Sequence, residues 1–396
     1  MARKSDVIQL WSPVISFFRC YAIVPLRQCH KEPYFERCRG SFYWCLLVAF
    51  VYLCTFIFSI LLVIDTFNSS SKMIADATFY LIYYAHCEMT VVFFLLQSSD
   101  LLQLLQHWID TERLLEENQI FLGRTVKCQC WFIFIATVIM SNLENALYIA
   151  GAVKDAENVT EIFYLLVKLA GKETDLNPYF GDYKDIYGFA LIFVESLSEV
   201  AWIAGDFIIA LVSIILRRYY EVHREQLRSQ HNASFQQLER LRRVQLALST
   251  LTHQVAELFS PLILITIGCD VIYILTFLYS GLDADISSPS LLVRFIFTYS
   301  FAYVIWRLMF SVYLASRLTE LPRKTVDYLY MLPSLVGYSM EQQRNRLIKM
   351  DLIVQEIQNE PTALSGGGFF VLSKSSASKL FGLIVTYEVV MLQLPR

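Results

Sequence analysis

The segment from Gly40 to Ile64 holds no charged residue and is bounded by Arg39 and Asp65. A helix that crosses about 30 Å of hydrocarbon needs roughly 20 apolar residues, so this segment is long enough to span a bilayer. Inside lipid the backbone must bond to itself, which limits such a segment to a helix or a closed barrel. The whole chain is 56% apolar and 17% charged, against about 45–50% and 25% in soluble domains. These values indicate a membrane protein throughout.

Six further segments are long and apolar and carry only isolated charges: Ala77–Leu96, Trp131–Val153, Ile186–Leu216, Leu258–Leu282, Leu291–Ser316 and Leu380–Leu394. The last is the shortest, and residues 369–372 could extend it towards the cytosol. We therefore predict an all-α membrane protein with seven transmembrane helices.

Lysine and arginine are distributed unevenly between the two sets of loops. If the N-terminus is cytosolic, the inside segments are 1–39, 99–130, 217–257 and 317–379, and they hold 25 of these residues. The outside loops 65–76, 154–185 and 283–290 then hold 5. Because cytosolic loops carry the excess of positive residues, we predict a cytosolic N-terminus and an extracellular C-terminus.

N-glycosylation sequons at Asn68 and Asn158 fall in predicted outside loops, which agrees with this orientation, whereas Asn232 falls inside. All nine cysteines lie in predicted cytosolic or membrane segments, so no extracellular disulfide is expected. The pair Cys128 and Cys130 lacks further ligands at a suitable spacing. We expect no metal and no other cofactor.

The cytosolic segments show helical periodicity of their own. Residues 217–251 have leucines and a valine at near-helical spacing, which predicts helical continuations of the fourth and fifth spans below the membrane. Residues 340–358 have a similar pattern. Such a layer could hold subunits together or form a solvated hairpin, and the pattern favours neither.

Acidic residues inside the spans are costly and are candidates for function. On the fourth span Glu195, Glu199, Trp202 and Asp206 are spaced to lie on one helical face. With the outer-half polar residues of other spans they give these ligand-binding candidates: Tyr84, Glu88, Asn142, Asn145, Glu195, Glu199, Trp202, Asp270, Tyr299 and Tyr303. Carboxylates and amides beside aromatic faces suit a neutral polyhydroxylated ligand such as a sugar. Alternatively, the acids pair with one another or with Arg294 and Arg307 to stabilise the bundle.

Several protein classes do not fit the chain. A G-protein-coupled receptor has the opposite orientation, and no Asp-Arg-Tyr follows the third span. No catalytic triad, His-Glu-x-x-His or phosphate-binding glycine loop is present, so we expect no enzyme. A net charge of −3 argues against nucleic acid as a partner. A secondary transporter of a small polar solute remains the alternative, although no internal repeat is found and the span count is odd.

The last predicted span begins with Thr386, Tyr387 and Glu388 and reaches Gln393 after further apolar residues. This resembles the Thr-Tyr, five hydrophobics, Gln signature of insect gustatory receptors, which insect odorant receptors share in a looser form. Glu388 departs from the apolar five, and Leu394 replaces the usual Phe. The Thr-Tyr-Glu start, with residues 362–366 followed by a Phe pair at 369–370, is similar to the sugar-receptor branch.

The resemblance implies a tetrameric ligand-gated non-selective cation channel, a homotetramer or a heteromer with related receptors, in the plasma membrane of chemosensory neurons. Its partners would be a small-molecule tastant, permeant cations and the lipid membrane. Four units follow: 1–39 as a cytosolic N-terminal segment, 40–316 as a six-helix ligand-binding bundle, 317–379 as a cytosolic anchor and 380–396 as the pore-lining seventh helix.

Helical geometry places Thr386, Val390 and Gln393 on one stripe. From spacing alone, ordinary helix packing with one buried Gln is the favoured explanation of such a stripe, and the family resemblance reverses this. The resemblance assigns it to the pore, with Val390 as a hydrophobic gate and Gln393 as a narrow filter. A ring of neutral amides carries no fixed charge, so we expect little discrimination among cations.

Overall fold

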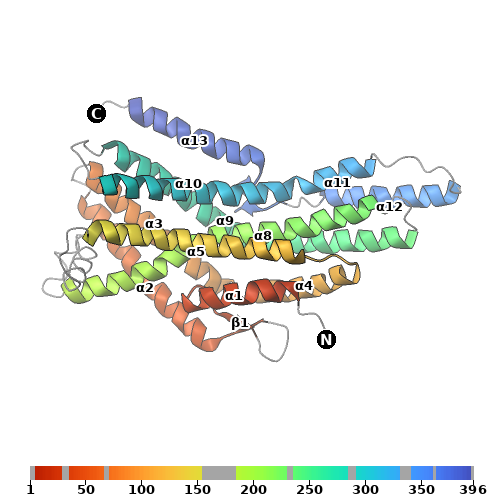
Figure 1. Cartoon of the computed structure of the whole chain (residues 1–396), viewed down its shortest axis with the longest axis horizontal. Helices are drawn as coiled ribbons and strands as arrows, with labels where there is room; N and C mark the ends of the chain where they lie inside the picture. Colours follow the sequence, from red (N-terminus) through yellow and green to blue (C-terminus); the bar gives the residue numbers. More distant parts are fainter. Residues whose placement is uncertain are drawn as a thin grey trace.

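The computed structural model describes residues 5–28, 35–66, 71–153, 184–229, 235–283, 291–330, 340–359 and 363–393. Within these ranges the chain forms long helices that run roughly parallel to one axis, together with two small antiparallel hairpins (Figure 1). The all-α class predicted from the sequence is confirmed for this part of the chain.

Six of the described helices are long and apolar enough to cross a membrane. They are α2 (Arg39–Thr66), α3 (Ser71–Leu96), α5 (Gly123–Val153), α8 (Lys184–Ser229), α9 (Phe235–Asp283) and α10 (Leu291–Thr319). Each contains one of the first six predicted spans.

The seventh predicted span lies in α13 (Lys374–Gln393), which is helical but is not among those six helices. Two features set it apart. It begins six residues before the predicted start at Leu380, and it includes the charged residues Lys374, Lys379 and Glu388. Seven spans and the orientation of the chain therefore remain predictions.

Helix α8 lies at the centre of the bundle. Its apolar segment is almost wholly buried, and it packs against α3, α5, α9 and α10, whereas α2 packs mainly on α3 and leaves a broad apolar face exposed. Gly205 allows α8 and α9 to approach closely, because a Cβ built there would stand 2.0 Å from Oγ1 of Thr266. This central position brings the acidic face of α8 into the interior.

The predicted helical continuations of the fourth and fifth spans are observed. Helices α8 and α9 run unbroken through residues 217–229 and 235–257, and α11 (Leu321–Tyr330) and α12 (Met340–Asn359) lie beside them (Figure 1). Arg242 of α9 pairs with Glu356 of α12 at 2.6 Å, and Lys349 of α12 pairs with Glu239 of α9.

No helix was predicted in residues 1–39 or 99–130, yet α1 (Asp6–Cys20) and α4 (Ser98–Glu117) occupy them. The strands β1 (Leu26–Gln28) and β2 (Phe35–Arg37) form an antiparallel hairpin between α1 and α2. Ser5 caps α1 by accepting a hydrogen bond from the backbone N–H of Ile8.

Glu112 of α4 holds the first turn of α1. Its carboxylate accepts hydrogen bonds from the Ser5 hydroxyl and, at 3.1 Å, from the Val7 backbone N–H. Lys127 of α5 pairs with Asp6 in the same turn. Burial raises the pKa of Glu112 to about 7, because the charged form loses its hydration. The first turn of α1 is thus tied to both α4 and α5 by polar contacts.

Candidate functional site

Two carboxylates on α8 each accept a hydrogen bond from a hydroxyl on a neighbouring helix. The Tyr84 hydroxyl of α3 donates to Oε1 of Glu195 at 2.5 Å, and the Ser141 hydroxyl of α5 donates to Oε1 of Glu199. Both glutamates are half-buried. We call Glu195 and Glu199 the outer carboxylates. They lie one helical turn apart, so both face the junction of α8 with α3 and α5.

Two turns further along α8, Asp206 takes part in a charged group that joins three helices. Nε of Arg307 on α10 lies 2.7 Å from Oδ2 of Asp206, and its Nη2 lies 2.6 Å from Oδ1 of Asp270 on α9. Ser311 donates to the other Asp206 oxygen at 2.9 Å. We call Asp206, Asp270 and Arg307 the arginine triad. All three side chains are at least 96% buried, so the pairing occurs away from water.

Trp202 lies between the outer carboxylates and the arginine triad. The guanidinium of Arg307 lies 4.9 Å from the centre of its ring, within the range of a cation–π contact. The rings of Tyr83, His86 and Tyr273 surround it, with centroids 4.5–5.2 Å away. Trp202 and these rings therefore form an aromatic layer between the outer carboxylates and the arginine triad.

His86 is fully buried in this aromatic group, and both of its ring nitrogens lack a hydrogen-bond partner among the described residues. A buried imidazole without a partner is costly. Neither His86 nor Ser141 was a candidate from the sequence. Ser141 carried one usable signal: it lies one helical turn before Asn145 and so shares its face.

The remaining candidates are spread over the same helices. Tyr303 is buried near Arg307, whereas Tyr299 is half-buried and donates to the carbonyl of Met140 on α5 at 3.0 Å. Glu88 and Asn145 are half-buried. None of these four residues takes part in the hydrogen bonds described for Glu195 and Glu199.

Asn142 is exposed, and its amide donates to the Val138 carbonyl one turn back on α5. Asp270 is fully buried against Arg307. The alternative considered from the sequence, that acids pair with an arginine to stabilise the bundle, describes Asp270. No observation on these residues tests ligand contact, so the ten assignments stay predictions.

The predicted pore residues lie on the last two turns of α13. The side chains of Thr386 and Val390 are exposed, and the Thr386 hydroxyl bonds back to the Gly382 carbonyl at 2.7 Å. Gln393 is helical, but its side chain lies outside the described part of the structure. The predicted glycosylation sites Asn68 and Asn158 also lie outside the described residues.

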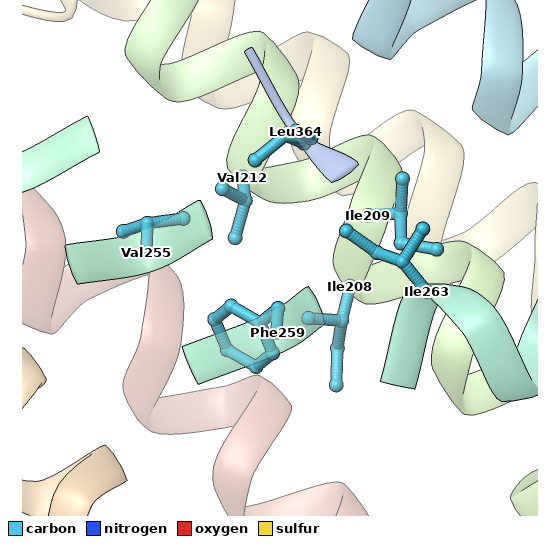
Figure 2. Close-up of a pocket in the computed structure, with 7 residues that line it drawn as sticks. All are labelled: Ile208, Ile209, Val212, Val255, Phe259, Ile263 and Leu364. Atoms are coloured by element: carbon cyan, nitrogen blue, oxygen red, sulfur yellow. The ribbon is translucent and has the colours of Figure 1, made fainter. Parts of the chain in front are cut away.

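A separate crevice lies between α8, α9 and Leu364 (Figure 2). Its lining consists of hydrocarbon side chains and the ring of Phe259: Ile208, Ile209, Val212, Val255, Phe259, Ile263 and Leu364. None of these groups can bond to a hydroxyl. The crevice therefore does not suit the polar ligand that the outer carboxylates suit.

The outer carboxylates and the arginine triad differ in the ligands that they can bind. The outer carboxylates already accept hydrogen bonds from protein hydroxyls, and the same oxygens can accept them from ligand hydroxyls. The positive charge of Arg307 is neutralised by two aspartates, so it does not offer a site for an anion. Among the described residues, no group of three or more histidines, cysteines or acids is arranged to hold a metal ion.

Comparison with known proteins gives three findings. The family model described as "Trehalose receptor" matches residues 6–396. The Gustatory receptor for sugar taste 64b of Drosophila melanogaster is 31% identical over 143 residues, which cover 36% of this chain and 32% of that receptor. The aligned stretch thus spans about a third of that relative.

Structures of the insect olfactory receptor OR5 from Machilis hrabei, one of them in complex with eugenol, match 98% of this chain and 100% of that chain. The TM-score is 0.71 for both, with sequence identities of 16% and 13%. At these identities the likeness concerns the fold alone.

Proposed function

The chain belongs to the trehalose receptor family of insect gustatory receptors, and from this premise we propose that it is a tastant-gated, non-selective cation channel that responds to sugars. The observation that carries the proposal is the pair of outer carboxylates, Glu195 and Glu199, each bonded to a hydroxyl from another helix. A sugar hydroxyl can replace each of these protein hydroxyls without leaving a buried acceptor unpaired.

The name of the Drosophila relative supports sugar as the ligand class, and the name of the family model points to the disaccharide trehalose as one candidate. The eugenol complex of the olfactory receptor supports a small-molecule ligand within this fold. On this basis the tastant enters each subunit from outside, among α3, α5, α8, α9 and α10. The channel lies in the plasma membrane of a chemosensory neuron.

Gating requires that the ligand binds the open state of the channel and the closed state with different affinities. Ligand shifts the closed–open equilibrium only by binding the open state more tightly. We propose that closure around the tastant moves the inner ends of the fifth and sixth spans, which lie in α9 and α10, and with them α13. Four α13 helices surround one pore, where a ring of Val390 side chains blocks water when narrow and a ring of Gln393 amides replaces part of the hydration shell of the cation.

The channel is tested by expressing the chain alone and recording currents during application of a panel of sugars. We expect a sugar-evoked current, and in Gln393→Ala a change in the relative permeability of Na⁺, K⁺ and Cs⁺. Gln355→Ala is the matched control, because Gln355 is exposed on the cytosolic helix α12. Saturable uptake of labelled sugar with no conductance would establish the transporter instead.

The ligand site is tested with Glu199→Gln. Loss of a charge-assisted hydrogen bond costs about 1.5–3 kcal/mol, so the half-maximal sugar concentration should rise roughly ten- to hundredfold. Glu221→Gln is the control, since Glu221 lies on the same helix below the membrane and pairs with Arg217. Surface expression must equal wild type in both. An unchanged dose–response in Glu199→Gln removes this residue from the site.

A further inference from the structure

A short hairpin connects the cytosolic helix α12 to α13. Its strands β3 (Ser365–Gly366) and β4 (Phe370–Val371) pair antiparallel. The turn between them contains Gly367 and Gly368, with φ of +59° and +74°, a backbone conformation that L side chains rarely adopt. Helix α13 begins three residues after β4, so the hairpin fixes where that helix starts. We call residues 364–373 the hairpin segment.

The hairpin segment is bonded to α9 next to a proline. The Gly367 backbone N–H donates to the Ser260 carbonyl at 3.0 Å, and the hydroxyl oxygens of Ser260 and Ser365 lie 3.4 Å apart. Pro261 has no N–H, so the carbonyl one turn earlier in α9, that of Glu257, lacks its usual intrahelical donor. The hairpin therefore joins α9 where its own hydrogen-bond ladder is interrupted.

Apolar contacts reinforce this junction. Leu364 is almost fully buried and points into the crevice between α8 and α9, beside Val212 and Ile263 (Figure 2). Leu372, at the other end of the segment, is fully buried, and its N–H donates to the Leu364 carbonyl at 2.8 Å. Two buried leucines thus hold both ends of the segment against the bundle.

The same segment is bonded to the last residue of α10 and to the first turn of α13. The Thr319 hydroxyl donates to the Leu372 carbonyl at 2.9 Å. Lys374 pairs with Glu320, one residue beyond α10, at 2.6 Å. The Ser373 hydroxyl accepts from the Ser376 backbone N–H at 3.1 Å and so caps α13. The segment therefore contacts α9, α10 and α13 within ten residues.

Along its own length α13 is held more loosely. It packs against α9 and α10, yet Phe381, Leu383 and Val390 are each about half exposed, while Ile384 is buried. Figure 1 shows α13 starting beside the hairpin and continuing along the bundle next to α10. Its polar contacts to the rest of the chain, in the described residues, gather at its start.

We propose that the hairpin segment is the link that couples α9 and α10 to α13, moving with α9 as one unit and passing displacement of α9 at Ser260 and of the end of α10 to the start of α13. Thr319, Ser260 and Gly367 are the positioning residues of this link. The inference rests on the channel function proposed above and names the part through which ligand binding reaches the pore.

The first test weakens the α10 side of the link. Thr319→Val removes the hydroxyl that donates to the Leu372 carbonyl and keeps the shape of the side chain. Loss of one such hydrogen bond corresponds to about a two- to tenfold change in the closed–open equilibrium. We expect a shift of that size in the half-maximal sugar concentration with unchanged cation permeability ratios. Thr319→Ser restores the wild-type response.

The matched control is Thr325→Val, because the Thr325 hydroxyl is buried on α11 and bonds only to the Leu321 carbonyl of its own helix in the contacts described. Identical responses in Thr319→Val and Thr325→Val overturn the coupling role while leaving the channel intact. A wild-type chain that passes no sugar-evoked current overturns the channel proposal, and this inference with it.

The second test uses the double variant Ser260→Cys with Ser365→Cys. The present oxygen separation of 3.4 Å is compatible with a disulfide after small adjustment. Oxidation in excised patches would then fix the hairpin to α9. Because the two move together in the proposal, the sugar response should persist after oxidation and match the response after reduction. Loss of current on oxidation, restored by dithiothreitol, shows that the hairpin must leave α9 and refutes the link.

Discussion

Removing a charge from the arginine triad should lower the stability of the bundle by an amount that depends on which charge is removed. Arg307 is one cation facing two aspartates, and all three side chains are at least 96% buried. Arg307→Met removes the only cation that the described contacts give to Asp206 and Asp270. Removing one partner of a buried ion pair costs about 3–5 kcal/mol, because the remaining charge is left without compensation. We expect Arg307→Met to lie at the upper end of that range.

Asp270→Asn should be much milder. The remaining Arg307–Asp206 pair is balanced one to one, and the amide oxygen of asparagine can still accept from Nη2 of Arg307. A cost of about 1–2 kcal/mol is expected for exchanging a charged acceptor for a neutral one. The triple variant Arg307→Met, Asp206→Asn and Asp270→Asn removes every charge together and should recover most of the stability lost in Arg307→Met.

The assay is the thermal stability of detergent-solubilised protein, followed as the loss of the monodisperse peak in size-exclusion chromatography after heating. Arg294→Met is the control, because Arg294 is an exposed arginine on the same helix, α10. The expected order of stability is wild type, Asp270→Asn, then Arg307→Met, with the triple variant above Arg307→Met. If Arg307→Met is no less stable than Asp270→Asn, the two aspartates are hydrated or protonated and the argument from charge balance fails.

Two further predictions concern helix contacts elsewhere. The pKa of Glu112 is raised to about 7 in the folded state, so docking of α1 should lose roughly 3 kcal/mol as the pH rises from about 4.5 to 7. Amide protection factors in α1, which correct for the intrinsic rise of exchange with pH, should therefore fall over that window in wild type and in the exposed-site control Glu117→Gln, but not in Glu112→Gln. Protection factors that stay constant in wild type contradict this prediction. Gly205→Ala places a methyl group against Thr266 and should cost about 1–3 kcal/mol in thermal stability; adding Thr266→Ala should recover part of it, and equal stability of the single and double variants would show that another contact is responsible.

The sequence determined the positions of the six helices that are long and apolar enough to cross a membrane, because long apolar runs in lipid leave the backbone no alternative to helix. It also determined that α8 and α9 continue beyond the fourth and fifth predicted spans, since their apolar spacing keeps the helical period past the limits of those spans. The acidic face of α8 followed from the same period. Each of these conclusions depends on residues close together in the chain.

Helix α4 was not found because its apolar residues alternate with charged ones, and α1 was not found because it has only 15 residues and contains Pro13. Ser5 followed by Asp6 is a helix start signal that could have been used. Glu112, which holds this start, lies 107 residues away from Ser5, and no local pattern connects them.

The tertiary structure decided which acid meets which partner. Glu195 and Asp270 are both acids in apolar segments, and by sequence they were equal candidates for ligand contact. Packing places a tyrosine hydroxyl against Glu195 and the Arg307 guanidinium against Asp270. Spacing along one helix determines which side chains share a face. The partner across the interface depends on how α8, α9 and α10 cross. The crossing is set by contacts such as Gly205 against Thr266, which lie on two different helices and cannot be read from either segment alone.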